Sequence, residues 1–286
     1  MASLRYRFIA AVILLCLLFS GSFAQRKSGS HTSRPRATMT PEARALLEEA
    51  SAVVCTQAKL DSKSSVAIDE MQARPSLPVQ HPDAQAGAQR AQKLLPIAKA
   101  LVISSLRQLV VEYNFQKSRR FQRRIQLAIA RVNAVRRVRP DMESRDNASV
   151  FLSRPQVITF GTIFLAGLRS DEGMISVLAH ELMHIADGEN DSLRLLVNAV
   201  GLKATDLTGL DVQGQRGEEI TCDLIGAMAV RAFVADTPGY ESIARRLARS
   251  IQHNCVEVDE GDEDHLSPRS TIRALLSLGL VVGPPK

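Results

Sequence analysis

Apolar residues recur with helical periodicity between residues 171 and 188. Four of them follow one another at spacings of three or four: Ile175, Leu178, Leu182 and Ile185. This spacing places them on one face of an α-helix, as expected for a core element. The carboxylates of Asp171 and Glu172 favour the start of a helix at this position, and Asp187-Gly188 favours its end. We therefore predict a core helix over this stretch.

Other stretches have the same periodicity and predict further helices. They are Ala84–Tyr113, Leu193–Leu202, Gly217–Phe233 and the basic segment Tyr240–His253. Pro96 lies inside the first of these and predicts a kink or a break. Thr40-Pro41 combines a good N-cap with a good first helical residue, so another helix is expected from Pro41 to about Gln57.

The stretch from Val150 to Leu165 has a different pattern. It is rich in β-branched and aromatic residues, with Ser153-Arg154-Pro155 in its middle. Such a pattern predicts two strands joined by a turn. The composition predicts more helix than strand, because 45% of the residues are hydrophobic but only 4% are aromatic. The expected fold class is α+β and mainly helical, with a small β-sheet beside the helix at 171–188.

The first 24 residues have the pattern of a secretory signal peptide. Arg5 and Arg7 precede an apolar run from Phe8 to Phe19, and small residues follow up to Ala24. We predict cleavage after Ala24 and export to the periplasm or the medium. A retained membrane anchor is the alternative, but the run is shorter than the about 20 residues of a membrane span.

The rest of the chain divides into two parts. Residues 25–83 predict a disordered lead, one helix and a linker, because Arg, Ser, Pro and Lys occur there without periodicity. Residues 84–286 predict one functional domain. No later segment has 18 apolar residues without a charge, so no transmembrane span is expected in the mature chain.

The formal net charge is +6, and much of it comes from one arginine-rich region. Its arginines are Arg119, Arg120, Arg123, Arg124, Arg131, Arg136, Arg137 and Arg139. The run could contact an anionic membrane peripherally or bind nucleic acid. Interleaved Ile125, Ile129, Val132 and Val135 favour an amphipathic element with a solvated face instead. Since no aromatic stacking platform accompanies the run, no nucleic-acid partner is predicted.

The predicted core helix also carries the most specific chemical motif of the chain, His180-Glu181-x-x-His184. Positions i and i+4 of a helix share a face, so both imidazoles can bind one metal ion. Glu181 lies beside them, where it can take a proton from a water that zinc has made acidic. The chain has only six histidines, so this spacing is unlikely to arise by chance. The motif predicts a zinc site.

Catalytic zinc takes three protein ligands, so a third must come from elsewhere. Metzincins place a histidine six residues after the second one, but that position is Asn190 here, which excludes the class. A glutamate on a later helix is the alternative. Glu219 opens the predicted helix Gly217–Phe233 and shares a face with Asp223.

His180-Glu181-x-x-His184 followed by Glu219-x-x-x-Asp223 resembles the M48 family of zinc metallopeptidases. Upstream, Asn147-Ala148 leads to Val157-Ile158-Thr159-Phe160-Gly161 without a gap, as in that family. Downstream, His265-Leu266-Ser267-Pro268 is similar to the family's turn before a final helix, although Thr271 stands where the family commonly has Arg. The resemblance covers the chain from about its middle to its end.

This resemblance implies a zincin-like fold in which His180, His184 and Glu219 hold one zinc ion per chain. Glu181 is then the general base, and Asp223 accepts a hydrogen bond from a ligand histidine. The strand just before the metal helix would present an open edge for a substrate backbone.

His265 is a further candidate, because the resemblance implies that the turn before the final helix faces the cleft. It would stabilise the oxyanion or occupy the fourth zinc position and keep the enzyme latent. The alternative is a solvated loop histidine among Asp262, Glu263 and Asp264.

Three cysteines remain once Cys16 leaves with the signal peptide. Cys55 and Cys255 are the expected disulfide pair, since Cys222 lies within the helix of Glu219. We do not expect Cys222 to bind zinc. Asn147 opens a glycosylation sequon in form, and the acidic residues 257–264 are expected to be a solvated loop without a calcium-binding motif.

The predicted function is that of an exported zinc endopeptidase acting on peptides or unfolded proteins. A weakly active or inactive binding module or chaperone for exported proteins, on the same fold, is the first alternative. A basic anion-binding protein that uses Arg119–Arg139 is the second. Peptide hydrolysis separates the peptidase from the binding module, whereas the activity of an anion-binding protein would be insensitive to chelators.

Overall fold

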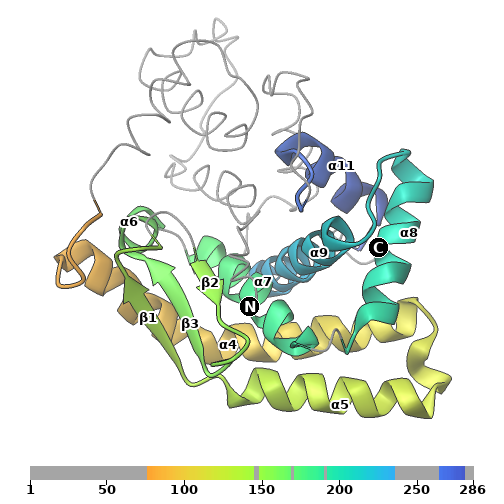
Figure 1. Cartoon of the computed structure of the whole chain (residues 1–286), viewed down its shortest axis with the longest axis horizontal. Helices are drawn as coiled ribbons and strands as arrows, with labels where there is room; N and C mark the ends of the chain where they lie inside the picture. The colour runs from red at the N-terminus through yellow and green to blue at the C-terminus, as the bar shows by residue number, and fades with distance from the viewer. Residues whose placement is uncertain (1–75, 145–147, 169–170, 190–191, 236–263, 281–286) are drawn as a thin grey trace, which may run out of the picture.

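The computed structural model describes residues 76–144, 148–168, 171–189, 192–235 and 264–280 (Figure 1). It is mainly helical with a small three-stranded mixed sheet, which confirms the expected fold class at that level. The elements in chain order are α4 (Pro82–Glu112), η1 (Phe115–Lys117), α5 (Arg119–Ala134), β1 (Arg137–Asp141), β2 (Ala148–Val150), β3 (Val157–Gly161), α6 (Thr162–Gly167), α7 (Asp171–Asp187), α8 (Arg194–Thr208), α9 (Gln215–Val234) and α11 (Pro268–Ser277).

Helix α7 lies at the centre of this arrangement, against α9, α4 and α5 (Figure 1). Every residue from Glu172 to Asp187 is buried. The predicted boundaries are confirmed, because the helix begins at Asp171 and ends before Gly188, whose φ of 71° suits glycine. The apolar face found in the sequence is therefore only one side of a helix that is enclosed on all sides.

Helices α7 and α9 approach closely at one glycine. A Cβ atom on Gly226 of α9 would lie 3.2 Å from the carbonyl oxygen of Ser176 on α7. Such a separation leaves no room for a larger side chain without displacement of the backbone. Glycine at this position therefore lets the two helices that carry the predicted metal ligands pack closely side by side.

The sheet has the strand order β1-β3-β2, with β1 parallel and β2 antiparallel to β3. Strand β3 is thus paired on both sides. The expectation that the strand just before the metal helix has an open edge was wrong, since β1 and β2 are the edge strands.

The predicted strand pair Val150–Leu165 was also too long, because Thr162–Gly167 is helix α6. A short apolar run such as Phe164-Leu165 fits a buried helical turn as well as a strand.

The arginine-rich region forms two elements rather than one amphipathic element. Helix α5 buries Ile125, Ile129 and Val132 as predicted, and the chain then turns into strand β1. Two of the arginines are engaged inside the molecule. Arg131 Nη1 donates to the carbonyl oxygens of Ala186 and Asp187 at the end of α7, at 3.0 and 2.8 Å, and Arg124 donates to Ser192. Contact of the remaining arginines with an anionic membrane stays a prediction.

Helix α4 continues through Pro96 without a break. Pro96 is exposed, so water can satisfy the carbonyl group that a proline leaves without a helical donor. Among the described helices, α4 is the one that is long and apolar enough to cross a membrane. Its buried residues pack against α7, α6, α9 and β1, as in the core helix of a folded domain.

Several predictions concern segments outside the described residues. They are the signal peptide at 1–24, the lead at 25–75 with its helix at 41–57, the Cys55–Cys255 pair, the Asn147 sequon, the helix at 240–253 and most of the acidic segment 257–264.

Candidate metal centre

The motif on α7 brings two imidazoles together in the interior. His180 Nε2 and His184 Nε2 lie 3.2 Å apart, one helical turn from each other. The exposed fractions of His180, Glu181 and His184 are 1%, 1% and 2%. Titratable side chains are rarely enclosed to this extent unless they are paired or bind a metal ion.

Helix α9 adds a carboxylate to this pair. Glu219 Oε2 lies 3.3 Å from His180 Nε2, and Glu219 Oε1 lies 3.6 Å from His184 Nε2. Oε2 is buried and has no hydrogen-bond partner among the described residues. The structure thus brings the three predicted ligands together with their donor atoms facing one another.

The other ring nitrogen of each histidine also faces a carboxylate. His180 Nδ1 lies 2.9 Å from Asp223 Oδ1, the partner expected for a ligand histidine. His184 Nδ1 lies 2.9 Å from Glu218 Oε1. The sequence interpretation missed Glu218, because it sought one such partner and took Glu218 only as a neighbour of Glu219. The requirement that each ligand histidine has its own acceptor could have found it.

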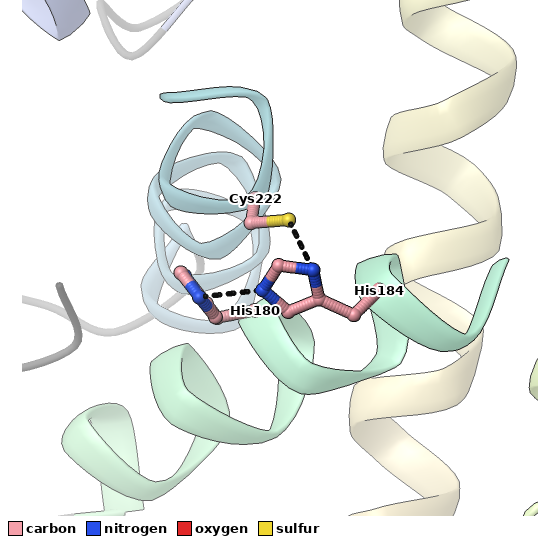
Figure 2. Close-up of side chains that lie close together, drawn as sticks. All are labelled: His180, His184 and Cys222. Carbon is pink, nitrogen blue, oxygen red and sulfur yellow. Dashed lines mark hydrogen bonds between the residues drawn. The ribbon is translucent and has the colours of Figure 1, made fainter. Parts of the chain in front are cut away.

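Cys222 completes the cluster from α9. Its Sγ lies 3.6 Å from His184 Nδ1, and His180, His184 and Cys222 together form a buried group that can hold a metal ion. Figure 2 shows that Cys222 and His180 approach opposite nitrogens of the His184 ring. His180 and Glu219 thus lie on the Nε2 side of the His184 ring, whereas Cys222 lies on its Nδ1 side.

The pKa values of Cys222, Glu219 and His180 are shifted by burial and by their neighbours in the cluster. Burial raises the pKa of the Cys222 thiol, so Cys222 is neutral at ordinary pH. Burial would also raise the pKa of Glu219, but His184 and His180 hold it well below its usual range. Burial lowers the pKa of His180, yet the carboxylates of Asp223 and Glu219 beside its two ring nitrogens raise it to about 9. The carboxylate of Glu219 and the imidazoles thus stabilise one another's charged forms within the cluster.

His265 reaches the same group from the turn before α11. Its exposed fraction is 5%, and its Nε2 lies 3.7 Å from Glu219 Oε2. The turn is held where Ser267 Oγ accepts a hydrogen bond from the Ser270 backbone N–H and caps α11. The interpretation of His265 as a solvated loop residue was wrong, because the helix packs on α8 and α9 and carries the turn inward.

No protein family, curated protein or solved structure matches this chain in the comparisons made.

Proposed function

We propose that the chain is a zinc-dependent endopeptidase with a zincin-like fold, as its resemblance to the M48 family implies. One observation carries the proposal, namely the separation of the His180, His184 and Glu219 donor atoms. Tetrahedral bonds of about 2.0–2.1 Å to zinc place neighbouring ligand atoms about 3.3–3.4 Å apart. The two Nε2 atoms are 3.2 Å apart, Glu219 Oε2 lies 3.3 Å from that of His180, and the other carboxylate oxygen, Oε1, lies 3.6 Å from that of His184. These separations are close to that requirement, with one carboxylate oxygen facing each imidazole.

His180, His184 and Glu219 would hold one zinc ion per chain. The metal supplies a Lewis acid that polarises the scissile carbonyl and makes water acidic enough to be deprotonated near neutral pH. Glu181 follows His180 on the same buried helix and accepts that proton. It then donates the proton to the amine that leaves.

His265 is proposed to act in the same site. Its Nε2 lies beside Glu219, so it can donate a hydrogen bond to the oxyanion or occupy the fourth metal position and keep the protein latent. His265→Ala distinguishes the two roles. A large loss of turnover with zinc retained supports the first, and a gain supports the second. A rate within about twofold of the parent rejects both, since a lost oxyanion donor costs about 10²-fold or more.

The substrates proposed are peptides or unfolded proteins outside the cytoplasm, which follows from the signal-like residues 1–24. The near-complete burial of His180, Glu181 and His184 within the described structure favours one alternative, a peptidase fold that binds exported proteins and cleaves them weakly. A peptidase assay on the purified chain separates the two functions.

Glu181→Gln tests the mechanism. The amide keeps the shape of the side chain but cannot accept a proton, so zinc content should stay near one per chain. Hydrolysis of casein or a peptide should fall by about 10²–10⁴-fold or more. An unchanged rate in this variant would contradict the role of Glu181 as general base. Absence of zinc from the parent protein would contradict the proposed metal site.

Glu219→Ala and Cys222→Ala form a matched pair that tests the ligand set. Loss of Glu219 should release zinc, whereas loss of Cys222 should leave zinc content near one per chain. The opposite result would place the metal on the Nδ1 side of His184, against Cys222.

A further inference from the structure

The two proposed ligand histidines differ in the groups that contact their Nδ1 atoms. His180 Nδ1 faces Asp223 alone among the contacts described at that atom, at 2.9 Å. His184 Nδ1 faces two groups of α9, Glu218 Oε1 at 2.9 Å and Cys222 Sγ at 3.6 Å. The group that accepts a hydrogen bond from Nδ1 determines the tautomer and the orientation of the His184 ring toward a metal ion.

Glu218 is the stronger acceptor of the two. A carboxylate takes a short, charge-assisted hydrogen bond from an N–H group, whereas a sulfur is a weak acceptor. An N–H on Nδ1 therefore donates to Glu218. The neutral imidazole then has its lone pair on Nε2, the nitrogen that faces His180 and Glu219.

We infer that Glu218 is a positioning residue, which fixes the orientation and tautomer of His184 for metal binding. This inference rests on the proposed function. In the resemblance to the M48 family, only Asp223 has such a role, whereas the structure assigns an equivalent carboxylate to each histidine. Glu218 binds no metal itself, because its contact is with the Nδ1 atom behind the ring.

A cavity beside Glu218 makes the inference testable by substitution. It has a volume of about 430 Å³ and is lined by residues of α8 and the start of α9, among them Arg194, Asn198, Gln215 and Glu218. Glu218 thus contacts His184 and also lines this cavity. A glutamine at this position can direct its carbonyl oxygen at His184 and leave its amino group in the cavity.

The experiment is a zinc competition titration of the full chain against a chromophoric chelator. The parent protein is compared with Glu218→Ala, Glu218→Gln and Cys222→Ala. Glu218→Ala should bind zinc about 10- to 100-fold more weakly, the range found when the hydrogen-bond partner of a ligand histidine is lost. Glu218→Gln should recover most of that affinity, since its carbonyl oxygen accepts the same hydrogen bond. Cys222→Ala should bind zinc like the parent.

A second readout separates positioning from a general loss of structure. The unfolding midpoint of each variant is measured after removal of metal, and Glu218→Gln should match the parent there. With saturating cobalt, the absorption spectrum of Glu218→Ala should keep the intensity of a four-coordinate site, because no ligand has been removed. Glu219→Ala, in which a proposed ligand is lost, is the contrasting control.

The results that overturn the inference differ from those that overturn the proposed function. If the parent binds no zinc, both fail. If the parent binds zinc and Glu218→Ala binds it equally well, Glu218 does not position His184. Weak binding by Cys222→Ala with normal binding by Glu218→Ala would transfer the role to the cysteine. Failure of Glu218→Gln to recover affinity would also reject the hydrogen bond as the cause.

Discussion

Helices α7 and α5 have nearly the same length, 17 and 16 residues, and opposite relations to solvent. In α5 one face is buried, and three arginines of its first two turns, Arg119, Arg120 and Arg123, are exposed. In α7 the polar residues after Asp171 are buried together with the apolar ones. A charged residue therefore has a different environment in each helix. On the outer face of α5 it is hydrated by solvent, whereas in α7 it requires a partner within the protein.

The cost of enclosure explains this difference. A buried polar group without a hydrogen bond costs about 1–3 kcal/mol, and a buried charge costs more. His180 and His184 meet this requirement through Asp223 and Glu218 on α9. Arg131 joins the two helices under comparison, since it extends from α5 to the carbonyl end of α7. Enclosed polar residues are retained where they form a site or a contact between elements.

The largest difference should come from one substitution made in both helices. Leu178 of α7 is fully buried, whereas Leu127 of α5 is 57% exposed. Leu178→Ala should lower the free energy of unfolding by about 2–5 kcal/mol through lost burial and a cavity. Leu127→Ala should change it by less than about 0.5 kcal/mol. Urea unfolding measures both, and similar losses would show that Leu127 is packed against residues outside the described ranges.

Zinc should stabilise the α7–α9 pair specifically. A metal that binds only the folded protein adds about 2.7 kcal/mol at a free concentration of 100 times its Kd. Thermal unfolding with added zinc or with a chelator measures this gain. Glu219→Ala should abolish it, and Arg123→Ala on α5 should leave it intact. A zinc effect that survives Glu219→Ala would mean that the metal stabilises the protein from another place.

Arg131 and Arg123 provide a matched pair within α5. Arg131 donates to two carbonyl oxygens at the end of α7, whereas Arg123 is exposed. Since a hydrogen bond from a charged group contributes about 1.5–3 kcal/mol, Arg131→Ala should lower the free energy of unfolding by about that amount. Arg123→Ala should have almost no effect. Equal effects of the two substitutions in denaturant titrations would remove Arg131 as the link between the helices.

The smallest effect concerns the first turn of α5, where Ser118 is the N-cap and no acidic residue is present. Positive charges there oppose the helix dipole. Arg120→Glu should therefore raise the free energy of unfolding by about 0.3–1 kcal/mol at low salt. Gln126→Glu in the middle of the helix is the control and should give less. If both variants gain equally, or if the gain persists at high salt, the dipole is not its cause.

Local sequence was sufficient for the elements that follow a helical period. The boundaries of α7 follow from Asp171 and Gly188, and the common face of His180 and His184 follows from their spacing of four. The face shared by Glu219 and Asp223 on α9 follows in the same way. A single helix sets each of these relations, so no knowledge of its neighbours was needed.

Tertiary structure decided what lies opposite each residue. The central place of β3, the contact of Glu218 with His184, and the position of Cys222 behind that ring depend on how separate elements approach. Gly226 lets α9 come close to α7, and the rotation of α9 then determines which carboxylate meets which imidazole. Neither helix specifies that rotation alone, because it results from packing both helices into one core.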